Sequence, residues 1–257
     1  MKIVFVGAGN LSTNVAKALF AAGHEIVQVY SRTIEAASLL AEAVGAEATD
    51  NLDEVAGQAD VYVISVKDGV LKSVAEHLCN GSREGLFVHT AGSMPMSLFE
   101  GHARRYGVFY PMQSFSKERQ VDFKDVSIFV EANNSEDLER LKTLGYSLSY
   151  NVRELSSEGR KHLHLAAVFA CNFANHCYDL ASCVLDKYDI PFDVMLPLID
   201  ETARKVHEVS PLKAQTGPAV RYDENVIGMQ RDMLPGGSLI QQIYSLMSKS
   251  IHERSRD

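Results

Sequence analysis

The chain has 257 residues, of which 46% are hydrophobic and 23% are charged, and its formal net charge is −8. This composition is typical of a globular protein with one large domain or two modest ones. The acidic balance argues against nucleic acid and anionic lipid as partners, because no positive field would attract them. The longest apolar stretch, residues 163–185, is interrupted by histidine, asparagine and aspartate, so we expect a buried helix there and no membrane span.

The four cysteines predict no metal site and no disulfide framework. Cys79, Cys171, Cys177 and Cys183 form no Cys-x-x-Cys pair, and no signal peptide precedes them, so we expect reduced thiols in a cytoplasmic protein. The last three are six residues apart in one helical pattern, which turns each about 120° from the one before. They therefore cannot gather around one metal ion.

The first residues have the pattern of a strand, a tight turn and a helix. A β-branched and aromatic run over 2–6 ends at Gly7 and Gly9, and helical spacing follows over 13–19. Such a turn can hold a pyrophosphate, because glycine lets the phosphate approach the backbone and the helix start supplies N–H donors. Ser12 stands where the usual G-x-G-x-x-G pattern has its third glycine, and a simple structural turn is the alternative. The residues expected to contact the cofactor here are Gly7, Gly9, Asn10 and Leu11.

The end of the next expected strand, residues 24–30, indicates which dinucleotide is bound. NAD enzymes usually place an acidic residue there to bind the ribose, whereas this chain has Ser31, Arg32 and Thr33. A guanidinium and two hydroxyl groups bind a 2′-phosphate through charge-assisted hydrogen bonds. We therefore expect NADP(H) as the cofactor; an exposed arginine on a solvated turn is the alternative.

Strand and helix patterns alternate over the rest of the first half. We expect helices over 34–44, 70–78 and 135–144, and strands over 60–66, 86–90, 107–110, 126–131 and 147–152. This alternation predicts an α/β fold of the Rossmann type, a doubly wound parallel sheet with its ligand crevice at the carboxyl ends of the strands. Asp68 follows one of these strands and can either cap the next helix or contact the cofactor.

From residue 155 onward the patterns are helical. We expect helices over 158–185, 192–209 with an early kink at Pro197, 221–233 and 238–251. The chain would then consist of an NADP-binding Rossmann domain over 1–153 and an all-helical domain over 154–257, with a small-molecule substrate bound between them.

The first long helix carries candidate catalytic residues. At about 100° per residue, Lys161, His164, Asn172 and Asn175 share one side of it. A histidine titrates near neutral pH, so His164 could donate a proton to a developing alkoxide or amine. The two asparagines would orient the substrate and Lys161 would attract a carboxylate. The alternative is a buried polar network or an interhelical contact.

Further candidates for substrate binding lie elsewhere in the chain. Tyr110 and Gln113 lie at the end of a strand, and both would reach the same crevice. Thr216, Arg221 and Asp223 surround the expected start of a helix, where an arginine with hydroxyl and N–H donors can bind an anion. The alternative is that these residues simply start the helix.

The chain resembles a Rossmann-like family of NADP oxidoreductases with a C-terminal helical domain of unknown function and, more distantly, pyrroline-5-carboxylate reductase and the deazaflavin-dependent NADP oxidoreductases. The segments that carry the resemblance are Gly7–Asn10, Ser31–Thr33, His89–Ser93, Tyr110–Phe115, the helix from His164 to His176, and Thr216–Pro218 with Arg221 and Asp223. Family members have His in place of Tyr110 and Gly in place of Tyr222. The resemblance implies a helical domain like that of 6-phosphogluconate dehydrogenase and a homodimer formed through it.

We therefore expect an NADP-dependent oxidoreductase that transfers a hydride between NADPH and a small carbonyl or imine metabolite. Val168 stands four residues before Asn172, so the lysine–asparagine pair of β-hydroxyacid dehydrogenases is missing. The sequence also has no HExxH pattern or nucleophile elbow, which gives hydrolase chemistry no support. The alternatives are a non-catalytic NADP-binding sensor and a protein whose helical face binds a deazaflavin.

Overall fold

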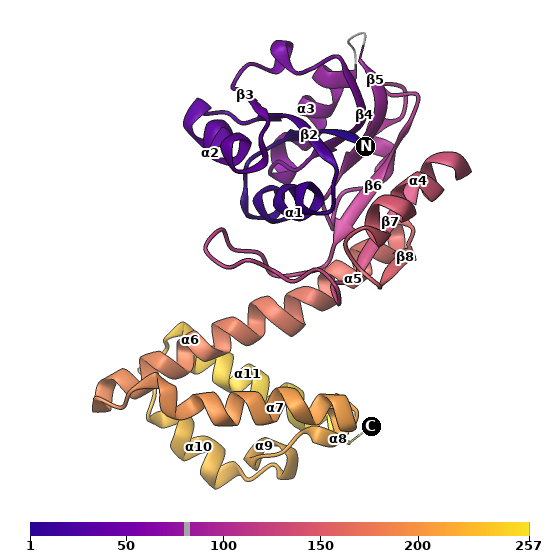
Figure 1. Cartoon of the computed structure of the whole chain (residues 1–257). Helices are drawn as coiled ribbons and strands as arrows, with labels where there is room; N and C mark the ends of the chain where they lie inside the picture. Colours follow the sequence, from indigo (N-terminus) through magenta and orange to yellow (C-terminus); the bar gives the residue numbers. More distant parts are fainter. Residues whose placement is uncertain (80–82, 257) are drawn as a thin grey trace. The chain divides into compact units, whose positions relative to one another are not determined.

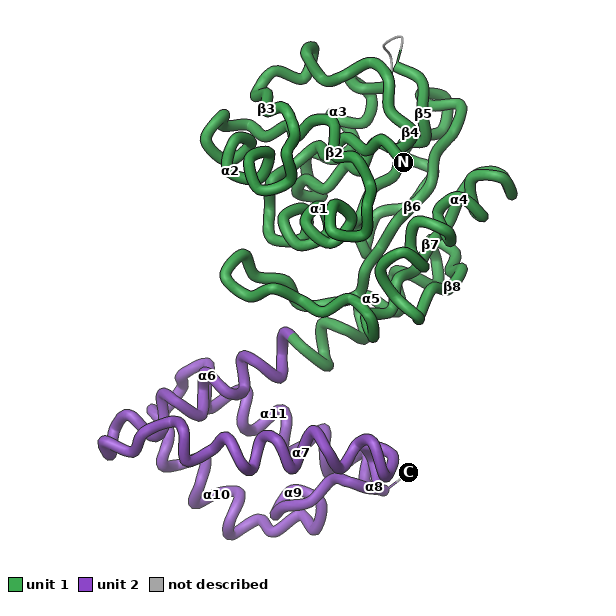
Figure 2. Tube along the Cα trace, in the orientation of Figure 1, with its two compact units in different colours: residues 1–171 green, residues 172–257 purple. Residues whose placement is uncertain are grey.

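The computed structural model describes residues 1–79 and 83–256, which form two compact units, Met1–Cys171 and Asn172–Asp257 (Figures 1 and 2). The first unit is an α/β structure, and the described part of the second is helical. The Rossmann-type fold followed by a helical region is therefore confirmed. The two units divide within a continuous helical stretch, after Cys171, whereas the domain boundary between 153 and 154 stays a prediction.

An eight-stranded sheet forms the centre of the first unit, in the order β3-β2-β1-β4-β5-β6-β7-β8. The strands are β1 (Lys2–Val6), β2 (Glu25–Tyr30), β3 (Glu47–Thr49), β4 (Gln58–Ile64), β5 (Glu84–His89), β6 (Tyr106–Pro111), β7 (Ile128–Ala132) and β8 (Val152–Glu154). Neighbouring strands are parallel except β6 and β7, which are antiparallel. The strand order reverses between β1 and β4, so the crevice predicted at the carboxyl ends of the strands lies beside these two.

Helices cover both faces of this sheet. They are α1 (Asn10–Ala21), α2 (Ile34–Val44), α3 (Asp68–Cys79), α4 (Ser135–Tyr146) and α5 (Ser157–Ala167), with the short 3₁₀ helices η1 (Leu52–Glu54) and η2 (Met96–Phe99). Ile3 and Phe5 of β1 belong to the buried cluster that includes α1, α2 and α4, whereas Val4 and Val6 belong to the cluster that includes α3 and η2. The alternation of side chains along one buried strand thus supplies both layers of the core.

Two details of the sheet differ from the sequence prediction. The predicted parallel sheet is confirmed for all neighbouring strands but one pair, because β7 pairs with β6 in the antiparallel direction. The strand expected over 147–152 is wrong, since β8 begins only at Val152. The alternation of serine with apolar residues over 147–150 resembles a strand, but the buried Ser149 hydroxyl is 2.6 Å from the Val126 carbonyl oxygen and belongs to an irregular connection.

The long helix expected over 158–185 is present but contains a π-helical segment. Here α5 leads into η3 (Val168–Phe173), a π-helix, and then into α6 (Ala174–Leu185). A π-helix holds more residues per turn than an α-helix, so the spacing of 100° per residue does not hold across this segment. The shared face predicted for Lys161, His164, Asn172 and Asn175 assumed α-helical spacing over the whole range. The angles calculated for Asn172 and Asn175 therefore do not apply.

The second unit continues with further helices. They are η4 (Asp186–Tyr188), η5 (Phe192–Met195), α7 (Leu196–Glu208), α8 (Pro211–Ala214), α9 (Pro218–Arg221), α10 (Glu224–Asp232) and α11 (Leu239–Arg254). The kink expected at Pro197 is wrong, because this proline lies in the first turn of α7, where it breaks no hydrogen bond. The single helix expected over 221–233 is interrupted at Tyr222, which has a left-handed φ of 51°.

Within the described residues, no helix combines the length and the hydrophobicity that crossing a membrane requires. The same part of the chain brings no group of His, Cys, Asp and Glu side chains together in a way that could hold a metal ion.

Candidate active site

A glycine turn joins β1 to α1. Gly7 has a φ of +120°, and a Cβ at this position would lie 2.1 Å from the carbonyl oxygen of Ser65. Gly9 is the N-cap of α1 and supplies no side-chain cap, and the first bond of the helix runs from the Thr13 N–H to the Gly9 carbonyl over 2.9 Å. The N–H groups before Thr13 therefore face out of the helix end, where they and the helix dipole can bind an anion.

The residues after Gly9 have different surroundings. Ser12 is fully buried beneath the turn, so a small residue is required there. The Asn10 side-chain amide donates a hydrogen bond to the Phe115 carbonyl over 3.1 Å, and Asn14 donates to the Ser116 carbonyl over 2.9 Å. The Asn10 side chain thus links the segment after β6 to α1, while the backbone N–H groups of Asn10 and Leu11 lie in the first turn of the helix.

Ser31, Arg32 and Thr33 lie at the carboxyl end of β2, next to the glycine turn. The Gly7 N–H donates to the carbonyl of Tyr30, the last residue of β2, over 2.8 Å. Arg32 and Thr33 are exposed, and Thr33 is the N-cap of α2 without a side-chain hydrogen bond. The guanidinium and the hydroxyl groups are therefore accessible beside the turn, as binding of a 2′-phosphate requires.

Asp68 was predicted either to cap the next helix or to contact the cofactor, and in the structure it is the first residue of α3. Its carboxylate accepts a hydrogen bond from the Ser93 hydroxyl. This bond ties the connection after β4 to the connection after β5 at the carboxyl edge of the sheet.

His164 lies against the loop that follows β5. A Cβ on Gly92 would be 2.5 Å from His164 Nδ1, so the ring occupies the space that the glycine leaves. The Tyr110 hydroxyl, at the end of β6, is 3.1 Å from the same nitrogen, and the two rings meet edge to face. Burial raises the pKa of Tyr110, so this hydroxyl stays protonated at neutral pH and can donate to Nδ1. In that arrangement, Nε2 of a neutral His164 ring carries the ring proton.

A buried ion pair beneath this loop was not predicted from the sequence. The Arg160 side chain is 1% exposed, and its guanidinium is 2.7 Å from the Glu131 carboxylate. No local pattern marks it, because the two partners are 29 residues apart and an arginine in a helix is usually solvated. The position of Arg160 one helical turn before His164 was the only available signal.

The structure does not bring the other predicted residues together with His164 into one described site. Lys161 is exposed, with its ammonium group 3.6 Å from Glu158 of the same helix. Asn172 and Asn175 are exposed and belong to the second unit, whereas Lys161 and His164 belong to the first.

The remaining candidates have local structural roles. Gln113 is exposed, and its side-chain oxygen accepts from the Ser114 N–H over 2.8 Å. Asp223 is the N-cap of α10 and accepts from the Val226 N–H over 3.3 Å. Thr216 precedes α9, and Arg221 ends it with an exposed side chain.

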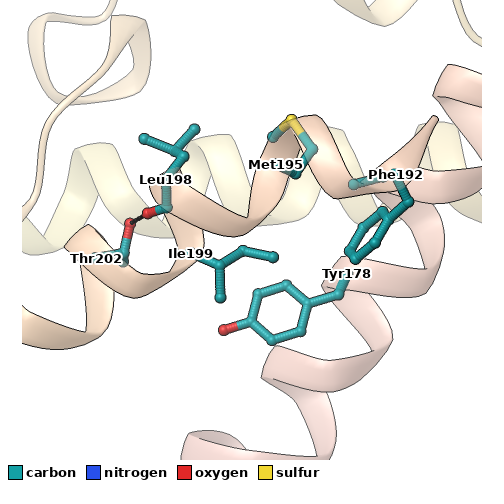
Figure 3. Close-up of a pocket in the computed structure, with 7 residues that line it drawn as sticks. Tyr178, Phe192, Met195, Leu198, Ile199 and Thr202 are labelled. Atoms are coloured by element: carbon teal, nitrogen blue, oxygen red, sulfur yellow. Dashed lines mark hydrogen bonds between the residues drawn. The ribbon is translucent and has the colours of Figure 1, made fainter. Parts of the chain in front are cut away.

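Two apolar cavities lie within the second unit. The smaller, of about 190 Å³, lies between α6 and the segment formed by η5 and α7, where Figure 3 shows Tyr178, Phe192 and Ile199 around it. The larger, of about 710 Å³, is lined mainly by apolar side chains of α6, α10 and α11. None of the predicted site residues lines either cavity.

Comparisons with known proteins agree with this architecture. Residues 2–91 match the family described as NADP oxidoreductase, coenzyme F420-dependent, and residues 126–251 match a domain family of unknown function, DUF2520. The crystal structure of a "putative NADP oxidoreductase" from Bacteroides fragilis is 57% identical, with a TM-score of 0.94 and 98% of each chain covered. A comparison with curated proteins gives no significant match.

More distant structures share the fold. A Thermotoga maritima protein has 24% identity and a TM-score of 0.71, covering 99% of this chain and 98% of its own. An imine reductase from Myxococcus stipitatus in complex with NADP⁺ has 13% identity and a TM-score of 0.68, covering 100% and 93%.

Proposed function

Since the chain belongs to the NADP oxidoreductase family of its Bacteroides fragilis relative and is an NADP-dependent oxidoreductase, we propose that it transfers a hydride between NADPH and a small carbonyl or imine compound. The observation that supports this reaction is the His164 imidazole, which Tyr110 and Gly92 hold at the carboxyl edge of the sheet that also carries the glycine turn. A proton donor on that side of a dinucleotide fold is what reduction of a carbonyl or imine requires.

The residues around the glycine turn fit the cofactor. Gly7 and Gly9 leave the backbone open, and the N–H groups of Asn10 and Leu11 bind the pyrophosphate. Ser31, Arg32 and Thr33 bind the 2′-phosphate. Asp68, held by Ser93, positions the loops that border the cofactor. NADPH, when bound, supplies the hydride.

The protein adds the proton and the contacts that orient the substrate. Before the step, Tyr110 donates to Nδ1 and keeps the ring proton on Nε2. As a hydride reaches the substrate carbon, His164 Nε2 gives its proton to the oxygen or nitrogen, and Nδ1 takes the hydroxyl proton of Tyr110, so that an alcohol or an amine is formed and the ring stays neutral. The Tyr110 phenolate then takes a proton from water. Lys161, Asn172 and Asn175 stay predictions for substrate binding, and so do Gln113, Thr216, Arg221 and Asp223.

The test is turnover of the His164→Ala variant. NADPH oxidation is first followed with a panel of keto acids, aldehydes and cyclic imines to find a reactive compound. We expect the variant to lose roughly a hundredfold or more in turnover and to bind NADPH as the wild type does. His162→Ala is the matched control, because His162 lies on the same helix with a side chain that is 74% exposed. Unchanged turnover of His164→Ala would remove His164 from the mechanism, and tight NADPH binding without turnover on any compound would contradict hydride transfer.

We further propose that the second unit associates with a second copy of the chain. Among its described residues, only Ala219 and Ser248 are buried. Large apolar side chains on α6, α7, α10 and α11 are exposed, and the cavity of about 710 Å³ opens between three of these helices. A helical unit without a core of its own requires another surface to cover its apolar side chains.

A further inference from the structure

Arg160 makes more contacts than an ion pair requires. Its Nη1 donates to Glu131 over 2.7 Å, its Nε donates to the Ala91 carbonyl over 3.2 Å, and its Nη2 donates to the Met94 carbonyl over 2.5 Å. Nη2 also lies 3.2 Å from the Ser157 hydroxyl. The planar guanidinium therefore joins β7 and α5 to the loop that follows β5.

Glu131 and Ser157 fix the guanidinium from behind. One Glu131 carboxylate oxygen accepts the Ser157 N–H over 2.9 Å, and the other accepts the Ser157 hydroxyl over 2.6 Å. The same hydroxyl accepts from the Met96 N–H over 2.9 Å. Because each of these polar groups has a partner, the network holds the guanidinium in one orientation.

The two carbonyls that Arg160 binds enclose Gly92. Ala91 comes directly before Gly92, and Met94 comes two residues after it. Ser93, between Gly92 and Met94, donates a hydrogen bond to Asp68. His164 lies against the Gly92 backbone, one helical turn after Arg160. Arg160 thus binds the backbone on both sides of the glycine that the His164 ring contacts.

Fold stability alone does not explain a buried charge at this place. Burying a guanidinium costs desolvation energy, and apolar side chains of similar size often stabilise a protein as well as a buried ion pair does. The charge also reaches the neighbouring rings. It adds to the effect of burial in lowering the pKa of His89, and it opposes the rise in the pKa of Tyr110 that burial causes.

We infer that Arg160 is a positioning residue for His164. By binding the Ala91 and Met94 carbonyls, it fixes the Gly92 backbone and keeps His164 Nδ1 within reach of the Tyr110 hydroxyl, so that the ring proton stays on Nε2. This inference rests on the proposed function of His164 as the proton donor.

The test is the protonation pattern of the His164 ring, observed by NMR of ¹⁵N-histidine-labelled full-length protein. The His164 signals are assigned by their loss in His164→Ala. In the wild type we expect one protonated and one unprotonated ring nitrogen. Tyr110→Phe removes the hydrogen bond directly and gives the reference spectrum of a ring without it. We expect Arg160→Met and Arg160→Lys to move the His164 signals toward that reference, because neither side chain can bind both carbonyls.

Arg105→Met is the matched control. It breaks another ion pair of the first unit, between Arg105 and the buried Asp137, and Arg105 lies directly before β6, at the other end of the connection from Ala91 and Gly92. We expect wild-type His164 signals in this variant. Wild-type signals in folded Arg160→Met would overturn the inference. If neither Arg160 variant folds, Ser157→Ala, which removes only one hydroxyl of the network, is measured instead. His164 signals shifted toward the Tyr110→Phe reference would support the inference, and wild-type signals would overturn it.

Activity separates this inference from the proposed function. With a compound that the wild type reduces, we expect Arg160→Lys to lower kcat roughly ten- to a hundredfold and to change NADPH affinity less than about twofold. A shift of the His164 signals in Arg160→Met together with normal turnover of His164→Ala would support positioning and contradict the catalytic role. Loss of turnover in His164→Ala with unshifted signals in Arg160→Met would support the catalytic role of His164 and contradict positioning by Arg160.

Discussion

At the scale of single residues, we expect Arg32 to determine how strongly the protein prefers NADPH to NADH. Its exposed guanidinium follows β2 beside the glycine turn, and a charge-assisted bond to a 2′-phosphate contributes roughly 1.5–3 kcal/mol. We expect Arg32→Ala to weaken NADPH binding roughly ten- to a hundredfold and to leave NADH binding unchanged, measured by nicotinamide fluorescence. Arg104→Ala is the control, because this exposed arginine precedes β6 and so lies at the amino ends of the strands, whereas Arg32 lies at the carboxyl ends. Equal losses for both cofactors would contradict the assignment.

Gly92 limits the space available to the His164 ring. A methyl group on Gly92 would lie 2.5 Å from His164 Nδ1 and 2.6 Å from its Cγ, so the ring must move. We expect Gly92→Ala to reduce turnover about tenfold or more while the protein remains folded, measured by NADPH oxidation and by thermal unfolding. In Gly57→Ala, the added methyl group meets no atom within 4 Å, so turnover should stay normal. Normal turnover of Gly92→Ala would show that the ring position does not matter.

The sequence predicted the location of residues that directly follow a strand. The glycine turn and Ser31–Thr33 follow strands directly, so their place at the carboxyl edge could be inferred from local pattern. The contacts of Gly92 with His164 and of Arg160 with Glu131 join segments that are far apart in sequence. Their spacing carries no periodic signal, and they became visible only in the folded chain.

At the scale of elements, β5 buries a histidine that makes stability depend on pH. His89 is fully buried, and its Nδ1 accepts the Ala91 N–H over 3.1 Å. Burial lowers its pKa to about 3, and the Arg160 charge acts in the same direction. The unfolded chain binds a proton at this residue below about pH 6.5, whereas the folded chain stays neutral there until about pH 3. Between these values the unfolded state binds more protons, so stability falls as the pH falls.

One proton changes the free energy of unfolding by at most about 1.4 kcal/mol per pH unit. We expect His89→Gln to flatten the loss of stability between about pH 6 and about pH 4 by up to this amount, measured by denaturant unfolding at each pH. His162→Gln replaces an exposed histidine and should keep the wild-type slope. A wild-type slope in His89→Gln would mean that other groups cause the pH dependence.

Helix ends show what local sequence determines at this scale. The predicted end of α2 at Gly45 is confirmed, because this glycine adopts the left-handed φ of 65° that commonly ends helices. At Tyr222 the same conformation, with φ 51°, interrupts a predicted helix without a glycine to mark it. The Tyr222 ring stacks on His252 at a centroid distance of 4.2 Å, a contact from α11 that helical periodicity cannot predict.

At the scale of the whole molecule, the two units differ in how they bury apolar surface. The first has a buried cluster on each face of its sheet. The second has almost no buried side chains among its described residues, although its sequence has clear helical patterns. Periodicity predicts that an apolar helix face is covered, but it does not say whether the same chain or another chain covers it. The predicted homodimer through these helices is the assembly that would bury this surface.

The predicted homodimer can be tested by charging one of these faces. Leu246 on α11 is 69% exposed, and Leu39 on α2 of the first unit is a matched control at 68%. We expect the wild type to be a dimer in sedimentation equilibrium, and Leu246→Lys to weaken dimerisation at least about tenfold, because a buried charge without a partner is costly. The monomer should also unfold more easily, since its helices lose the surface that covers them. Leu39→Lys should remain a dimer. A wild-type monomer at micromolar concentration that unfolds cooperatively would contradict the assembly, because the second unit would then be stable without a second copy.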